Sequence, residues 1–301
     1  MTEQNNRMGI WMMVLVTFIF SVQDAASRHL GELYDIRFIV MVRFWFFALF
    51  AVALSYRATG SAFGALKTKQ PIAQFFRALI MVLEIGIMVV AFTKLGLVET
   101  HAIFACYPLI IAALSGPILG ESVGWRRWVA IGIGFIGVLI ILQPSDGVFS
   151  LVSLWAVVPT VMFATYGIMN RYVARKDSAA TSFFWMGVFG MIMSTAVGVF
   201  YWENMAPVDW IWMLFLCIIS LAGHYLLIRA YEVAQASAIQ PFAYLQLPFA
   251  SFIGVTMFGD NLRTNVVIGA VIVVTAGVFT LIREQLAARK QTKAARAVAG
   301  R

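Results

Sequence analysis

The segment PLIIAALSGPILGE, residues 108–121, has a counterpart in the second half of the chain, PFASFIGVTMFGD, residues 248–260. Both segments open on proline, continue as an apolar run and close on glycine followed by a carboxylate. Further out, FSVQDAASR at residues 20–28 matches FATYGIMNR at residues 163–171 in register. The chain therefore consists of two similar halves, and each half repeats the same order of helices.

The composition indicates a membrane protein. Of the 301 residues, 61% are hydrophobic and 12% are charged, against roughly 45–50% apolar and 25% charged in soluble domains. Each apolar stretch is near the length that a helix needs to cross the hydrocarbon core. The stretches are residues 10–28, 36–56, 72–93, 100–119, 126–142, 151–172, 181–201, 208–229, 236–258 and 264–283. The sequence thus predicts an all-α integral membrane protein with ten transmembrane helices.

The placement of basic residues predicts the topology. With a cytoplasmic N-terminus, most Lys and Arg residues fall on the cytoplasmic side, as the positive-inside rule requires. The opposite side receives only Arg28, Arg37, Lys94 and Arg263. The net charge of +8 follows from this bias, so we expect no nucleic-acid partner. We expect a bacterial inner-membrane protein with both termini in the cytoplasm and a basic cytoplasmic tail at residues 285–301.

An odd number of helices per half means that the second half inserts upside down relative to the first. We predict repeat 1 at residues 8–143 and repeat 2 at residues 150–284, with Glu121 on the inner side and Asp260 on the outer side. Inverted repeats are typical of secondary transporters, whose substrate sites lie near the bilayer midplane between the halves.

The paired Leu-Gly-Glu and Phe-Gly-Asp turns resemble the twin EamA repeats of the drug/metabolite transporter superfamily over residues 8–284. Further strings that carry the resemblance are RFWF at 43–46, FRAL at 76–79, GESVGWRRW at 120–128 and QPFAYL at 240–245. The resemblance implies a ten-helix alternating-access carrier in two inverted five-helix EamA repeats. The superfamily includes exporters of amino acids and related metabolites, and the pattern is also similar to uptake carriers for S-adenosylmethionine and riboflavin-type compounds.

Ionisable groups inside membrane spans are costly, which makes them candidates for function. Asp24 and Arg43 lie at similar depths, so they form either a structural ion pair or separate contacts to a cation and a carboxylate of the substrate. Glu84 falls mid-helix and can carry a proton or meet an amine. Its repeat counterpart, Gly223, is followed by His224, a second titratable candidate. The alternative for Glu84 and His224 is a partner on a neighbouring helix.

Prolines within helices free backbone carbonyls and can turn neighbouring polar side chains toward a cavity. This criterion selects Tyr107 beside Pro108, and Tyr244 and Gln246 near Pro248, with packing alone as the alternative. Tyr166 and Trp185 are candidates for an aromatic or polar wall. His101 lies near a predicted helix end, where we expect it to be solvated.

No P-loop, serine nucleophile motif or His/Cys metal cluster is present, and Cys106 and Cys217 lack metal-ligand spacing. We therefore expect no enzymatic activity, cofactor or metal. The main hypothesis is a monomeric secondary transporter of a small metabolite, an amino acid or a related zwitterionic or aromatic compound, with protons as a candidate coupling ion. The alternatives are an S-adenosylmethionine or riboflavin-type carrier, an integral-membrane enzyme acting on lipid-linked substrates, and a non-transporting scaffold.

Overall fold

The computed structural model describes residues 6–119, 125–142, 151–173, 176–234, 239–279 and 282, and these residues form helices and turns without any strand. The prediction of an all-α fold is confirmed. Glu121 and the basic tail at residues 285–301 lie outside the described residues, so their predicted placements stay predictions.

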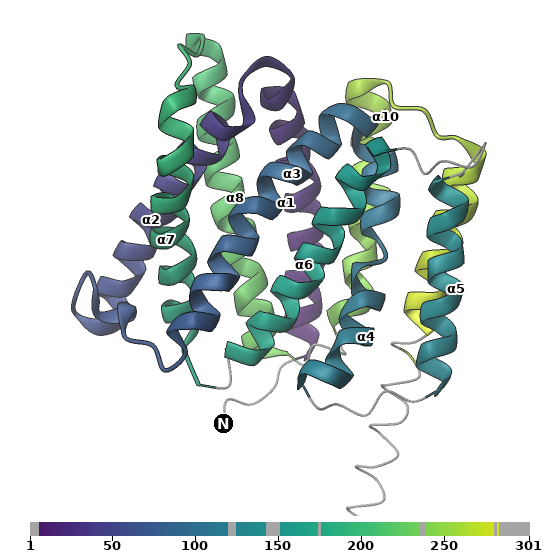
Figure 1. Ribbon diagram of the computed structural model, residues 1–301, viewed down its shortest axis with the longest axis horizontal. Coiled ribbons are helices and arrows are strands. Elements are labelled where there is room, and N and C mark those ends of the chain that lie inside the picture. Colours follow the sequence, from purple (N-terminus) through teal and green to yellow (C-terminus); the bar gives the residue numbers. More distant parts are fainter. Residues whose placement is uncertain are drawn as a thin grey trace, which may run out of the picture.

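Apolar helices dominate the chain, and their order is visible in Figure 1. Five helical segments are long and apolar enough to cross a membrane, and shorter apolar helices accompany them. The helices are α1 Asn6–Leu33, α2 Ile36–Thr59, α3 Pro71–Phe104, α4 Tyr107–Leu119, α5 Trp125–Leu142, α6 Leu154–Val173, α7 Ala179–Gly198, α8 Pro207–Val233, α10 Gln246–Phe258 and a final helix, Thr264–Phe279.

The long helix α3 is two helices joined at Gly96, which has a φ of 79° and a ψ of 172°. The chain reverses there, as a contact between its two segments shows. The Thr100 hydroxyl donates a hydrogen bond to the Ala91 carbonyl, whereas these two residues would be about 13 Å apart in a straight helix. The fourth span therefore begins at Leu97, breaks after Phe104 and continues as α4. With α3 divided in this way, the described residues form the ten predicted spans.

The packing of the helices follows the expected pseudo-two-fold relation between the halves. Helix α2 packs against α7, and the contact of α1 with α8 is matched by the contact of α6 with α3, each between one half and the other. Similarly, α1 contacts the Gln240–Leu245 3₁₀ turn and α10, as α6 contacts α4. These contacts place the interface between the halves along α1, α3, α6 and α8, in the centre of the bundle.

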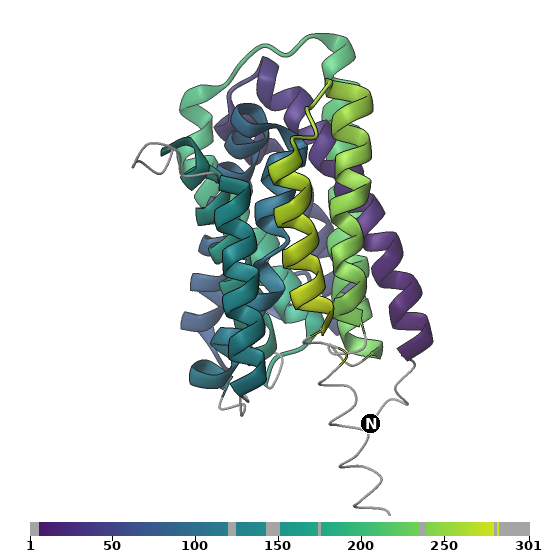
Figure 2. The same ribbon diagram turned by 90° about the vertical axis from the view of Figure 1, so that its right-hand side faces the viewer.

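Helix α5 and the final helix form a pair at one end of the bundle, as Figures 1 and 2 show. They cross at two glycines. A Cβ added to Gly137 would lie 2.9 Å from the Gly269 carbonyl oxygen, and one added to Gly269 would lie 2.5 Å from the Gly137 carbonyl oxygen. Close backbone approach at small residues is the usual way in which helices pack in lipid, where no hydrophobic effect draws them together.

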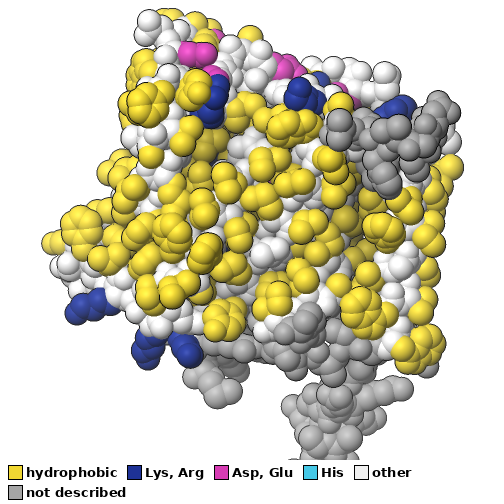
Figure 3. All heavy atoms as spheres, viewed as in Figure 1, with side chains coloured by type: hydrophobic (Ala, Val, Ile, Leu, Met, Phe, Trp, Pro, Cys, Tyr) yellow, Lys and Arg dark blue, Asp and Glu magenta, His cyan; other side chains and the backbone are white. Residues whose placement is uncertain are grey.

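The surface in Figure 3 has a broad band of hydrophobic side chains, with charged side chains gathered at its upper and lower margins. Large apolar residues on this outer surface, such as Trp11, Leu49 and Phe252, are about 70% exposed. A surface of this kind fits a hydrocarbon environment and would be an aggregation hazard in water.

We expect Gly96→Ala to destabilise the protein by about 3 kcal/mol. The φ and ψ of Gly96 belong to a region used almost only by glycine, with a cost of about 1–3 kcal/mol for other residues. The added Cβ would also lie 2.7 Å from an Asp260 carboxylate oxygen. The measurement is the thermal unfolding midpoint in detergent.

Gly86→Ala is the matched control for Gly96→Ala. Gly86 lies in the same helix with no heavy atom within 4 Å of an added Cβ. Since alanine is a better helix former than glycine by up to about 1 kcal/mol, we expect this variant to be unchanged or slightly more stable. Equal unfolding midpoints for the Gly96→Ala variant and the wild type would contradict the role given to the reversal.

Candidate functional site

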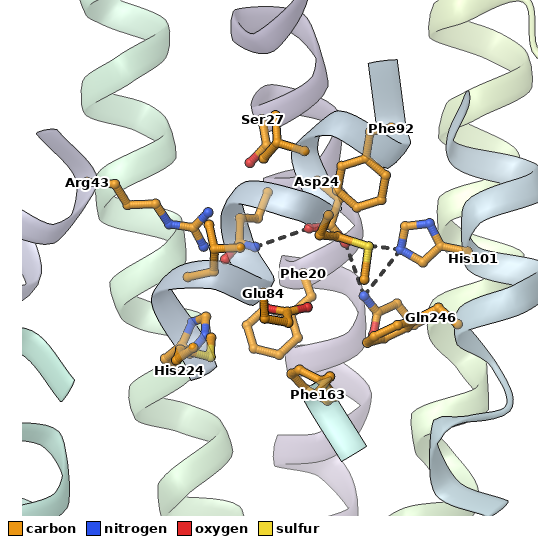
Figure 4. Close-up of a pocket in the computed structure, with 16 residues that line it drawn as sticks. Phe20, Asp24, Ser27, Arg43, Glu84, Phe92, His101, Phe163, His224 and Gln246 are labelled. Atoms are coloured by element: carbon orange, nitrogen blue, oxygen red, sulfur yellow. Dashed lines mark hydrogen bonds and ion pairs between the residues drawn. The ribbon is translucent and has the colours of Figure 1, made fainter. Parts of the chain in front are cut away.

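A small cavity lies between the halves, where α1, α2, α3, α6, α8 and α10 meet (Figure 4). Its polar lining residues are Gln23, Asp24, Ser27, Arg43, Glu84, His101, His224 and Gln246, and its apolar lining residues are Phe20, Met81, Ile85, Met88, Val89, Phe92, Phe104 and Phe163. Eight polar side chains around one cavity in an otherwise apolar bundle are the main candidates for function.

The volume of the cavity is about 50 Å³, whereas ligand pockets usually hold about 300–1,000 Å³. A metabolite therefore fits only after the surrounding helices move apart.

Asp24 is the centre of a hydrogen-bond cluster on one side of the cavity. Its Oδ2 lies 3.0 Å from His101 Nε2 and accepts a hydrogen bond of 3.1 Å from Gln246 Nε2. Its Oδ1 accepts a hydrogen bond of 3.1 Å from Gln23 Nε2. The partners come from α1, from the helical segment after Gly96 and from α10, so the carboxylate joins both halves of the protein.

Arg43 reaches the cavity from α2, on the side opposite His101 and Gln246 (Figure 4). It is 2% exposed. Its Nε and Nη2 atoms are buried without a hydrogen-bond partner among the described residues. Asp24 hydrogen-bonds Gln23, His101 and Gln246 instead, so the alternative of a structural Asp24–Arg43 ion pair is not what the structure forms. An arginine with free donors in a closed cavity can receive an anionic ligand group.

His224 lies on the same side of the cavity as Arg43, and Glu84 lies between that side and the side of His101 and Gln246 (Figure 4). Glu84 is 4% exposed and stands midway between Pro71 and Gly96 on α3. His224 donates from Nδ1 to the Ser220 carbonyl at 3.0 Å, and its ring packs against Phe20 and Phe47.

The structure thus brings together five of the sequence-predicted candidates, namely Asp24, Arg43, Glu84, His224 and Gln246. Two others, Tyr107 and Tyr244, line a smaller adjoining cavity. It lies between the start of α4 and the junction of the Gln240–Leu245 3₁₀ turn with α10. Tyr244 points away from the central cavity. Its hydroxyl lies against Gly277 of the final helix, where an added Cβ would overlap it.

Tyr166 and Trp185 do not line the central cavity. The Tyr166 hydroxyl donates to Met186 Sδ at 3.3 Å, and the Trp185 indole donates to the Leu66 carbonyl at 3.1 Å and stacks on Phe189. Both side chains stabilise contacts between helices.

His101 is a cavity residue that the sequence reasoning placed in solvent, although it is 3% exposed. The difference arises at Gly96, where the chain reverses one helical turn earlier than the apolar stretch suggests, so that His101 lies inside the span. The glycine followed by a Leu-Val-Glu-Thr-His string was the available signal, since glycine favours the conformation of a tight reversal.

A second buried polar cluster surrounds Arg77, which is fully buried. Its Nε donates to Gln74 Oε1 at 3.0 Å, one Nη donates to Asn170 Oδ1 at 2.8 Å, and the other donates to the Ser182 carbonyl. Tyr166 adds a hydroxyl contact at 3.4 Å. Unlike Arg43, this guanidinium is surrounded by protein acceptors, so it ties α3 to α6 and α7.

Asp260 connects the helices at the end of the bundle that lies opposite Arg77. Its Oδ1 pairs with Arg28 at 2.6 Å, and its Oδ2 accepts hydrogen bonds from the backbone N–H groups of Leu97 and Val98 at 2.7 and 3.2 Å. This carboxylate of the second half therefore fixes the end of α1 and the Gly96 reversal, both in the first half.

Among the described residues, no group of three or more His, Cys, Asp or Glu side chains is arranged to hold a metal ion. The cluster of Asp24 with His101 supplies two candidate ligands, and its other members are amide groups.

The comparisons with known proteins agree with this architecture. The EamA-like transporter family profile matches residues 7–143 and 150–282. A protein named S-adenosylmethionine uptake transporter from Rickettsia prowazekii is 25% identical over 92% of this chain and 93% of its own length. A riboflavin transporter from Vibrio cholerae is 26% identical over 94% of this chain and 95% of its length.

A solved crystal structure has the same fold, with a TM-score of 0.60 and 16% identity over 93% of this chain and 98% of that one. At this identity, the likeness supports the fold alone.

Proposed function

Because this chain belongs to the EamA-like transporter family, we propose that it carries a small metabolite with an α-amino acid head group, of the S-adenosylmethionine type, through the cavity between its halves. The protein is a multi-pass membrane transporter. The proposed substrate class rests on the charged groups that line the cavity.

The two buried N–H donor atoms of Arg43 that have no hydrogen-bond partner among the described residues, Nε and Nη2, are the observation that carries the proposal. A buried charge without a partner costs several kcal/mol, and such a group is retained where a ligand supplies the missing partner. A carboxylate fits best, because its two oxygens match the fork of guanidinium N–H donors.

Asp24 and Glu84 supply negative charge for the cationic part of the substrate. The phenyl rings of Phe92, Phe104 and Phe163 supply apolar faces against which a flat ring can stack. S-adenosylmethionine has a carboxylate, two cationic centres and an adenine ring, so it complements all three features. A riboflavin-type compound has the ring but lacks the carboxylate that would satisfy Arg43.

The closed cavity supports alternating access between two end contacts. Opening one end requires the separation of Asp260 from Arg28 and from the Gly96 reversal. Opening the other end requires α3 to part from α6 and α7 near Arg77. The proposal places a monomer in a bacterial inner membrane with both termini in the cytoplasm, and it includes no enzymatic step.

The test is counterflow in proteoliposomes that contain purified protein. Vesicles preloaded with one candidate compound are diluted into the same compound at tracer level, with amino acids, S-adenosylmethionine and riboflavin tested in turn. We expect saturable counterflow for S-adenosylmethionine or an amino acid. Counterflow for riboflavin alone would contradict the substrate class, and protein-free vesicles serve as the control.

A further inference from the structure

The contacts of both His101 ring nitrogens bear on the number of protons in the Asp24 cluster. His101 Nδ1 lies 2.9 Å from the Leu97 carbonyl oxygen, and Nε2 lies 3.0 Å from Asp24 Oδ2. A carbonyl oxygen can only accept, so Nδ1 carries a hydrogen. In a neutral imidazole Nε2 then holds a lone pair, which could accept from Gln246 Nε2 at 3.4 Å but would face the lone pairs of the nearer Asp24 Oδ2 at 3.0 Å.

One additional proton resolves this conflict. If Nε2 is protonated, His101 is an imidazolium that donates to both partners. Gln246 and Gln23 each donate to one oxygen of Asp24, so a proton placed on His101 Nε2 gives this carboxyl group a third donor. Phe92 stacks on the imidazole with ring centroids 5.3 Å apart and planes 4° apart, so the ring is held in this orientation.

We propose that Asp24 and His101 form a proton site, and that the cationic group of the substrate displaces this proton when it binds to Asp24. The inference rests on the proposed function for the nature of the displacing cation. The proton leaves His101 Nε2 for water, and the ring returns to the neutral form with its hydrogen on Nδ1. One positive charge thus replaces another beside the same carboxylate.

The other charged and titratable groups around the cavity favour this exchange. Arg43 faces the cavity from α2, Glu84 from α3 and His224 from α8, while α10 contributes the uncharged Gln246. With the substrate carboxylate paired to Arg43, the substrate cation and the imidazolium would both lie beside the single carboxylate of Asp24, where like charges repel. Cation binding and loss of the proton are therefore linked.

The proton site can be tested without any substrate, because the chain has only three histidines. Nitrogen NMR of histidine-labelled protein is measured near neutral pH, with signals assigned from His29→Gln, His101→Gln and His224→Gln. We expect both ring nitrogens of His101 to be protonated in the wild type, and Nε2 to lose its proton in Asp24→Asn. An unprotonated Nε2 in the wild type would overturn the proposal.

The exchange is tested in proteoliposomes with S-adenosylmethionine as the probe. For exchange of one proton for this singly positive molecule, a gradient of one pH unit should accumulate the probe up to about tenfold on the acidic side. In His101→Gln, we expect no accumulation and a flux that no longer changes with pH, whatever its rate. His29→Gln, whose side chain lies outside the cavity, should accumulate the probe as the wild type does.

The outcomes separate the two proposals. Counterflow without accumulation in the wild type would overturn the proton exchange and leave the transporter assignment intact. Absence of counterflow for every compound would oppose the proposed substrate class, while the NMR measurement still decides whether the proton site exists.

Discussion

Arg43→Gln is expected to weaken substrate binding about 100-fold, which corresponds to about 2.7 kcal/mol. Removal of one partner of a buried, hydrogen-bonded charge pair typically costs about 2–5 kcal/mol, since the other charge is left buried and unpaired. Here that other charge is the carboxylate of the bound substrate. The measurement is the concentration dependence of binding or counterflow with purified protein.

The same variant should not lose stability, and this expectation separates a binding role from a structural one. Nε and Nη2 of Arg43 have no partner to lose among the described residues, so glutamine removes a buried charge without leaving a protein acceptor unsatisfied. We expect an unchanged or raised unfolding midpoint. Arg37→Gln is the matched control on the same helix, because Arg37 is exposed and pairs with Asp35. It should retain wild-type affinity.

A wild-type affinity in Arg43→Gln would contradict the assignment of a carboxylate to this side of the cavity. A strongly lowered unfolding midpoint would show instead that Arg43 holds the fold together.

Arg77→Ala is expected to have the opposite profile, with a loss of about 3 kcal/mol in stability. The substitution leaves acceptors on Gln74, Asn170 and Ser182 without their donor, and buried unsatisfied groups cost about 1–3 kcal/mol each. It also leaves a cavity in place of a fully buried side chain. For a protein of this size we expect the unfolding midpoint to fall by about 5 °C.

Lys67→Ala is the control for Arg77→Ala, because it removes an exposed basic residue near the same end of the bundle. Its free energy of unfolding should stay within about 0.5 kcal/mol of the wild-type value, as for most surface substitutions. Protein that remains folded in Arg77→Ala should bind substrate with nearly normal affinity, since Arg77 does not line the central cavity. An unchanged midpoint would refute its structural role.

Much of the candidate site could be anticipated from the cost of placing polar groups in lipid. Asp24, Arg43 and Glu84 are conspicuous in apolar runs, and the repeat offset pointed to His224 and Gln246. The aromatic candidates were less informative. Tyr166 and Trp185 lie in contacts between helices. Aromatic residues are common throughout this chain, so the residue type alone does not reveal which of them face the cavity.

The sequence by itself determined the fold class, the ten spans and the two similar halves. Apolar length and repeated strings are properties of the chain in one dimension, and lipid leaves helices as the main way to satisfy the backbone. The tertiary structure alone decided which polar groups meet. The rotation of each helix and the reversal at Gly96 put His101 against Asp24 and left Arg43 unpaired, because side-chain partners depend on contacts between residues far apart in the sequence.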